Sequence, residues 1–173
     1  MGLVLIIFFS PNRGYEKTLD RYFSAHEKQN ANLLYSKVYA DYWIDYTNEA
    51  WGDGVALDWI EESIFENLDN WDCGENVKIS YKIKNKIRAT KPELKELENC
   101  IIDEYIDYVG NKGSYKISAA YLLDVRVTIK NGSEKNEFYY PDGLLVIKEN
   151  GKWKLTRGYI SCSFLENHAD AFQ

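Results

Sequence analysis

The chain of 173 residues is long enough for one domain with its own core, and its content of 45% hydrophobic residues excludes a disordered chain. Its net charge of −6 argues against nucleic acid as a partner, because phosphate binding needs a basic surface. Cys73, Cys100 and Cys162 lie far apart and lack metal-binding spacing. We therefore assign no metal and no cofactor, and interpret the cysteines as buried or half-buried thiols.

An unbroken apolar run stands near the N-terminus, where residues 3 to 9 read LVLIIFF. The run is far shorter than the roughly 20 residues that cross a bilayer, and no basic segment precedes it. Two interpretations stay open. Residues 1–13 are an apolar leader that remains from a signal or membrane-anchor segment, or the run is a buried strand or the start of a helix.

Three segments then have the spacing of amphipathic helices. Apolar side chains recur every three or four residues from Tyr15 to His26, from Leu34 to Tyr46 and from Leu57 to Asn70. The segment Trp51 to Gly54 predicts a turn between the last two of these helices. We interpret His26 as a cation at the end of the first helix, where the helix dipole favours positive charge.

The period changes to two at Val77, which predicts a strand. Apolar and basic residues alternate from Val77 to Arg88, so this strand is expected to have one apolar face and one basic face. Thr90 and Glu93 have the spacing of a capping box at the start of another helix. The buried stripe of that helix is expected to run to Tyr105.

The C-terminal part of the chain has the pattern of antiparallel strands. An alternating run from Tyr115 to Ile129 predicts a strand long enough to need a bend or a bulge. A return strand starts at Phe138 and is interrupted at residues 141–143. Asn150-Gly151 predicts the turn of a hairpin from Leu144 to Tyr159, because both residues accept positive φ.

These elements predict a single α+β domain over residues 14–165, with N-terminal helices packed on a curved antiparallel sheet. The polar tail of residues 166–173 is expected to fray. The order of elements resembles the nuclear transport factor 2-like superfamily, which is also grouped as cystatin-like. The resemblance rests on the amphipathic helices, the strand before the capped helix, the long strand and the closing segment Leu144 to Leu155, which contains Gly-Lys-Trp-Lys.

The segment Gly74 to Tyr81 is also similar to uncharacterised members of that superfamily from Gram-positive bacteria, many of which sit outside the cell behind an N-terminal membrane segment. The resemblance implies a cone-like fold with a cavity between helices and sheet. Its enzymes use an Asp or His inside the cone, with a tyrosine or a second acid as hydrogen-bond donor. Because the fold hosts enzymes, binding modules and dimerisation domains, the resemblance does not assign a function.

The segment between Val38 and Val77 has an unusual charge. It holds eleven of the 27 acidic residues and none of the basic ones, together with four of the five tryptophans. One interpretation is an acidic, aromatic face for a cationic partner, because aromatic rings attract cations and nearby acids steer them. The other is that the acids form the solvated face of two helices while the tryptophans fill the core. The absence of basic residues keeps the first interpretation open, because like charges one turn apart on a helix repel each other and exposed helices ordinarily mix both signs.

The basic face of the strand from Val77 to Arg88 also has more than one interpretation, and pairing with the acidic helices of this chain or of a second copy is one of them. Five basic groups on one face are suited to an anionic lipid, a wall polymer or an acidic partner. Alternatively, lysines protect an edge strand from pairing with other sheets.

Our leading hypothesis is a non-catalytic binding or interaction domain outside the cytoplasm, tethered to a membrane through the N-terminus. Its partner is a protein or a small ligand, cationic in character. The alternatives are an isomerase- or dehydratase-type enzyme that uses the cone cavity, and a structural homodimerisation module. No catalytic residue is assigned. The candidate binding residues are Tyr42, Tyr46, Trp51, Trp59 and Tyr121.

Overall fold

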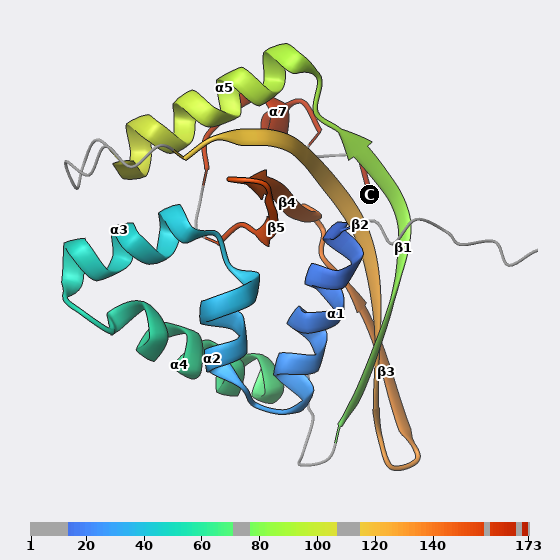
Figure 1. Cartoon of the computed structure of the whole chain (residues 1–173). Coiled ribbons are helices and arrows are strands. Elements are labelled where there is room, and N and C mark those ends of the chain that lie inside the picture. Colours follow the sequence, from blue (N-terminus) through green and yellow to red (C-terminus); the bar gives the residue numbers. More distant parts are fainter. Residues whose placement is uncertain (1–13, 71–76, 107–114, 158–159, 169–170, 173) are drawn as a thin grey trace, which may run out of the picture.

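The structure is a computed structural model that describes residues 14–70, 77–106, 115–157, 160–168 and 171–172 (Figure 1). The N-terminal apolar run, Trp71 and Cys73 lie outside these residues, and so does the predicted end of the closing hairpin at residues 158–159.

The helical N-terminal part begins with α1, which confirms the first predicted helix. The helix predicted from Leu34 to Tyr46 is wrong as a single element, because the chain leaves helical geometry at Tyr39 and Ala40. Tyr39 forms a parallel bridge with Leu155, and the Ala40 N–H donates to the Leu155 carbonyl at 3.0 Å. A tertiary contact with the closing strand therefore interrupts the helical pattern. The helical elements are α1 (Gly14–Glu27), α2 (Ala31–Leu33), η1 (Leu34–Val38), α3 (Asp41–Trp51) and α4 (Val55–Asn70).

The strands form one antiparallel sheet in the order β1-β2-β4-β5. β3 pairs with the C-terminal half of β2, beyond the part that pairs with β4, so β3 and β4 together form the interrupted return strand that the sequence predicts. A register shift between β2 and β4 also confirms the irregularity expected in the long strand. The strands are β1 (Lys78–Arg88), β2 (Ile117–Asn131), β3 (Glu134–Tyr139), β4 (Leu144–Glu149) and β5 (Lys152–Leu155).

A bulge in β1 divides its basic residues between the two faces of the sheet. Lys82 pairs with Arg126 of β2, whereas Lys86 pairs with Leu123, and the register shifts between Ile83 and Asn85. Because side chains alternate along a strand, Arg126 and Leu123 point to opposite faces, and so do the two lysines that pair with them. The expectation of one basic face from Lys78 to Arg88 is therefore wrong.

The two-residue turn of the closing hairpin is confirmed. Asn150 and Gly151 have φ values of 46° and 81°, and Lys148 pairs with Trp153 across the turn. The capping box of α5 is present as well, since the Glu93 carboxylate accepts from the Thr90 N–H at 2.6 Å. The remaining helical elements are α5 (Lys91–Ile101), η2 (Ile102–Ile106) and α7 (Ser163–Glu166).

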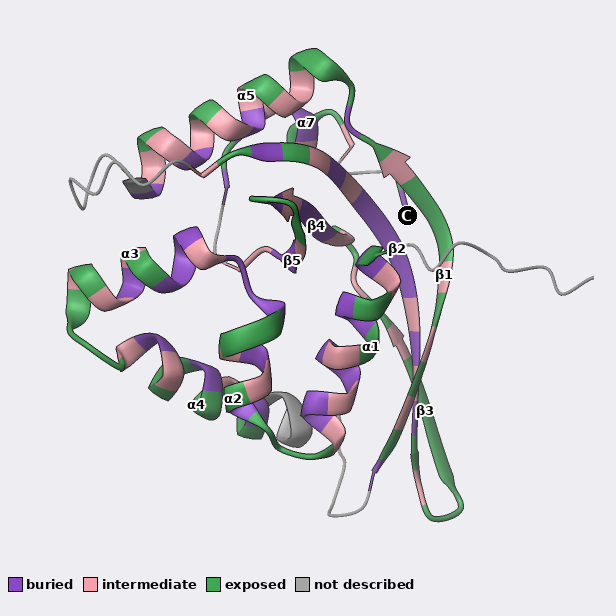
Figure 2. Ribbon diagram, viewed as in Figure 1, coloured by how far each residue is buried: buried purple, intermediate pink, exposed green. Residues whose placement is uncertain are grey.

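The sheet curves around the N-terminal helices, which confirms the predicted α+β class. Figure 1 shows α1 to α4 on the concave side of β1 and β2, with α5 and α7 over the other face at one end of the sheet. In Figure 2 the purple, buried residues of the helices lie mainly on the sides that face the interior of the molecule. Phe172, in the tail expected to fray, is only 5% exposed. The core contains Leu19, Phe23, Ile60, Leu97, Val125, Val127 and Val146.

Candidate functional site

The turn between α3 and α4 carries an exposed group of aromatic rings, which we name the aromatic tip and define as Tyr46, Trp51 and Trp59. Trp51 is 53% exposed and Trp59 is 37% exposed, and their ring centroids are 5.1 Å apart. The ring of the half-buried Tyr46 meets Trp51 edge-on at 5.4 Å. Three of the five predicted binding residues therefore lie together at the surface.

The other two predicted residues do not form part of this surface. Tyr42 is 1% exposed and lies under the tip, where its ring packs on Tyr105 at 5.1 Å. Tyr121 lies on β2 and packs against the rings of Tyr15 and Trp153, at 5.1 and 5.6 Å. Tyr42 is therefore not part of the surface of the tip, because its helical face packs inward, and Tyr121 belongs to a different part of the molecule. Both stay predictions as binding residues.

The charged residues of the two helices that carry the aromatic tip have a single sign. Every charged residue from Asp41 to Asn70 is acidic, and seven of these acids have exposed side chains. Helical spacing places Glu49 three residues after Tyr46 and Glu62 three residues after Trp59, on the same sides of their helices as these rings. The exposed acids are Asp45, Glu49, Asp53, Asp58, Glu61, Glu62 and Glu66.

An asparagine that sequence reasoning missed holds the two helices of the tip together. The Asn48 side-chain oxygen accepts from the Ala56 N–H at 3.0 Å, and its amide nitrogen donates to the Tyr35 hydroxyl at 3.2 Å. This bond satisfies a backbone donor in the first turn of α4, which otherwise has no partner within the helix. Gly52 and Gly54 complete the turn with φ values of 118° and 89°.

Arg157, which follows β5, supports the tip from inside. Its guanidinium donates to the Ser63 hydroxyl at 2.9 Å and to the Trp59 carbonyl at 3.3 Å. It also lies over the rings of Tyr39 and Trp43, at 5.3 and 5.0 Å from their centroids. Sequence reasoning missed Arg157 because an isolated arginine after a strand forms no recognisable pattern.

The interior beside Arg157 contains protonated tyrosines and a neutral histidine. Burial raises the pKa of Tyr22 and of Tyr39, and raises the pKa of Tyr140 to about 12. Burial, and then the nearby Arg157, lower the pKa of His26 to about 4. The interpretation of His26 as a helix-end cation is therefore wrong, because its 0% exposed ring is neutral at pH 7.

A second polar group organises the start of α3. The Glu149 carboxylate accepts from the backbone N–H groups of Asp41 and Tyr42, at 2.7 and 3.1 Å. Lys154 is 4% exposed, donates to the Tyr39 carbonyl at 3.1 Å and forms an ion pair with the Asp41 carboxylate. Burial raises the pKa of Glu149, although the two N–H groups favour its ionised form. These contacts tie the closing hairpin to the helices.

The cysteines of the described residues are free thiols. Cys100 is half-buried and Cys162 is buried, and burial raises the pKa of both thiols. Across the described ranges, no three His, Cys, Asp or Glu side chains are grouped closely enough to hold a metal ion. In the same part of the chain, no helix is both long and apolar enough to cross a membrane.

No family model, curated protein or solved structure matches the chain. The resemblance to the nuclear transport factor 2-like superfamily therefore stays a prediction, and the observed fold establishes the α+β class.

Proposed function

We propose that the protein is a non-catalytic binding domain that holds a cationic segment of a protein partner on the aromatic tip. The single observation that carries the proposal is the pair of exposed rings, Trp51 and Trp59, on helices whose charged residues are all acidic. Large aromatic side chains are normally buried, so two in contact at the surface favour a recognition role.

The chemistry of this surface selects a lysine- or arginine-rich segment. An ammonium or guanidinium group over an exposed aromatic face gains about 0.5–1 kcal/mol, and tryptophan is the best such ring. The surrounding acids attract the segment before contact and disfavour acidic partners. Asn48 and Arg157 fix the two helices, so the rings are held in place before a partner arrives.

The test measures the binding of a fluorescently labelled peptide rich in lysine and arginine by anisotropy, at about 0.05 M and 0.5 M salt. We expect binding that weakens strongly at the higher salt concentration, because exposed charges are then screened. A peptide of the same length with glutamate in place of the basic residues is the control and should not bind.

Matched variants separate the tip from general acidity. Neutralising three acids of the tip, by Asp53→Asn, Asp58→Asn and Glu62→Gln, should weaken binding about tenfold or more. A control that removes the same charge elsewhere, by Glu16→Gln, Glu134→Gln and Glu137→Gln, should change it less than about twofold. Equal losses in the two triple variants would overturn the proposal.

The other hypotheses remain predictions. The enzyme hypothesis rests on the resemblance alone, and in the homodimerisation hypothesis the outer face of the sheet pairs with a second copy. A location outside the cytoplasm, with a membrane tether, depends on residues 1–13, which lie outside the described residues.

A further inference from the structure

A groove of about 400 Å³ lies between the start of α1, η1 and the closing strand β5, on a part of the molecule distinct from the aromatic tip. Its charged lining consists of five basic residues and one acid, which we name the basic groove. These residues are Lys17, Arg21, Lys37, Lys152, Lys154 and Asp41.

The single acid of the basic groove is already neutralised. Asp41 forms an ion pair with Lys154, whose side chain is 5% exposed and is also fixed by the Tyr39 carbonyl. Within the described residues, none of the other four basic side chains forms an ion pair with a carboxylate. The groove therefore concentrates positive charge from three separate elements on one small volume, in a protein that is acidic as a whole.

The walls of the groove are fixed by close packing. The Thr18 hydroxyl donates to the Trp153 carbonyl at 3.0 Å, and Thr18 is 2% exposed. The indole of Trp153 lies so close to Gly14 that a Cβ added there would be 2.3 Å from its Cδ1. Because α1 and β5 are locked together, the basic side chains on them stay near one another without a ligand.

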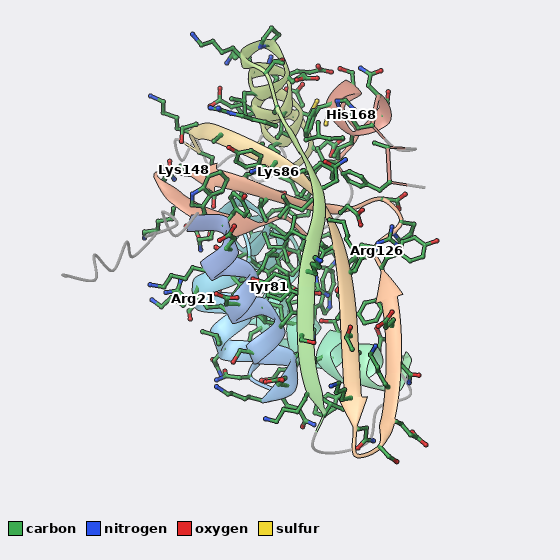
Figure 3. All side chains as sticks on the ribbon, turned by 90° about the vertical axis from the view of Figure 1, so that its right-hand side faces the viewer. Arg21, Tyr81, Lys86, Arg126, Lys148 and His168 are labelled. Carbon is green, nitrogen blue, oxygen red and sulfur yellow. The ribbon has the colours of Figure 1, made fainter. Side chains whose placement is uncertain are left out.

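Other basic groups share this side of the molecule. Figure 3 shows Arg21 and Lys86 on the same side of β1 as Lys148, whereas Arg126 lies on the other side. Lys86 is on this side because the bulge in β1 reverses its direction relative to Lys82. An approaching anion therefore meets positive charge around the groove as well as in it.

We propose that the basic groove binds a phosphate group. A phosphate carries up to two negative charges and several acceptor oxygens, so it can engage the lysine ammonium groups and the Arg21 guanidinium together. A single carboxylate would leave most of these cations unpaired. The phosphate belongs either to a small phosphorylated molecule or to the headgroup of an anionic phospholipid.

The experiment uses the whole chain and two phosphate sources. Inorganic phosphate and pyrophosphate are titrated by calorimetry and by amide chemical shifts, and vesicles of phosphatidylglycerol are compared with vesicles of phosphatidylcholine by co-sedimentation. We expect shifts at Lys17, Arg21 and Lys152 with the soluble anions, or selective binding to the phosphatidylglycerol vesicles. The first result identifies a small phosphorylated ligand and the second a lipid headgroup.

Charge-matched variants test the position of the site. Lys17→Gln with Arg21→Gln should weaken the observed binding about tenfold or more, and Lys37→Gln with Lys152→Gln should do the same. Lys91→Gln with Lys95→Gln on α5 removes equal charge from exposed positions and should change binding less than about twofold. Circular dichroism checks that each variant folds. If the variant with Lys17→Gln and Arg21→Gln does not fold, the variant with Lys37→Gln and Lys152→Gln tests the site in its place.

Three outcomes would overturn the proposal. One is the absence of binding to all of the phosphate probes, and another is an equal loss in the α5 control. The third is concentration-dependent self-association, lost in the groove variants without any phosphate binding, because the occupant would then be the acidic tip of a second copy. Since the groove and the tip share no charged residue, failure here leaves the peptide experiment unaffected.

Discussion

The aromatic tip and the basic groove carry opposite charge and are built in opposite ways. The tip comes from one short stretch of chain, and its rings extend from two consecutive helices into solvent. The groove draws on α1, η1 and β5, which meet only in the folded protein, and one of its cations is buried. A surface formed by neighbouring residues can change with little effect on the fold, whereas one assembled from distant segments is part of what the fold holds together.

The largest expected effect tests the groove side of this comparison. Glu149→Ala removes the acceptor of two backbone N–H groups at the start of α3 and a negative charge near Lys154. Leaving buried donors unsatisfied should cost about 3 kcal/mol of unfolding free energy, measured by urea denaturation. Glu149→Gln keeps one acceptor oxygen and should cost clearly less. A loss below about 1 kcal/mol for Glu149→Ala would mean that these contacts do not hold the groove to the fold.

The next effect concerns the interior that supports the tip. The pKa of His26 is about 4 in the folded protein, against 6.5 for an ordinary histidine, so the unfolded chain binds more protons between these values. The folded state should therefore lose about 2–3 kcal/mol of stability as the pH falls from 7 to 4.5. His26→Phe keeps an aromatic ring against Tyr22 and should flatten this dependence. Urea denaturation of both proteins at pH 7 and pH 4.5 measures this pH dependence of stability. The same loss of stability in the variant would exclude His26 as the cause.

The smallest expected effect is at the surface of the tip itself. Trp51→Ala removes a side chain that is 53% exposed and has ring contacts with Tyr46 and Trp59. It should change the unfolding free energy by less than about 1 kcal/mol, while it weakens binding of the basic peptide about threefold to fivefold. Thermal unfolding and anisotropy on the same preparation make the comparison. A large loss of stability would show that Trp51 contributes to the core. The tip would then affect the stability of the fold as the groove does, and the contrast between the two surfaces would be lost.

The sequence predicted the features whose causes are local. The Thr90–Glu93 capping box and the Asn150-Gly151 turn depend on residues a few positions apart, and both are present. The helical period of α1 and the alternation of β2 are local in the same way and are present too. The tip was also visible, because its tryptophans and acids stand close together in the chain. The pattern could not separate Tyr42 from Tyr46, however, since both lie on apolar stripes and only packing decides which is buried.

Features that depend on distant partners were not predicted. The break at Tyr39 and Ala40 requires Leu155, and the support of α4 by Arg157 requires the end of the closing strand to reach it. The basic groove has no sequence signature, because its residues come from the two ends of the domain. The alternating pattern of β1 also predicted the wrong face for its later lysines, because one extra residue in the pairing with β2 turns the side chains after it to the opposite face of the sheet.

The bulge near Lys84 has a further consequence for how the protein behaves at high concentration. Within the described sheet, β1 is the outermost strand at one side and has only β2 as a neighbour. A second β-strand that added to this side would meet a change of register partway along, where its side chains would face the wrong way. The bulge that distributes positive charge over two faces of the sheet thus shortens the part of β1 that is available for pairing with a strand of another molecule. Exposed lysines before and after the bulge add repulsion between copies.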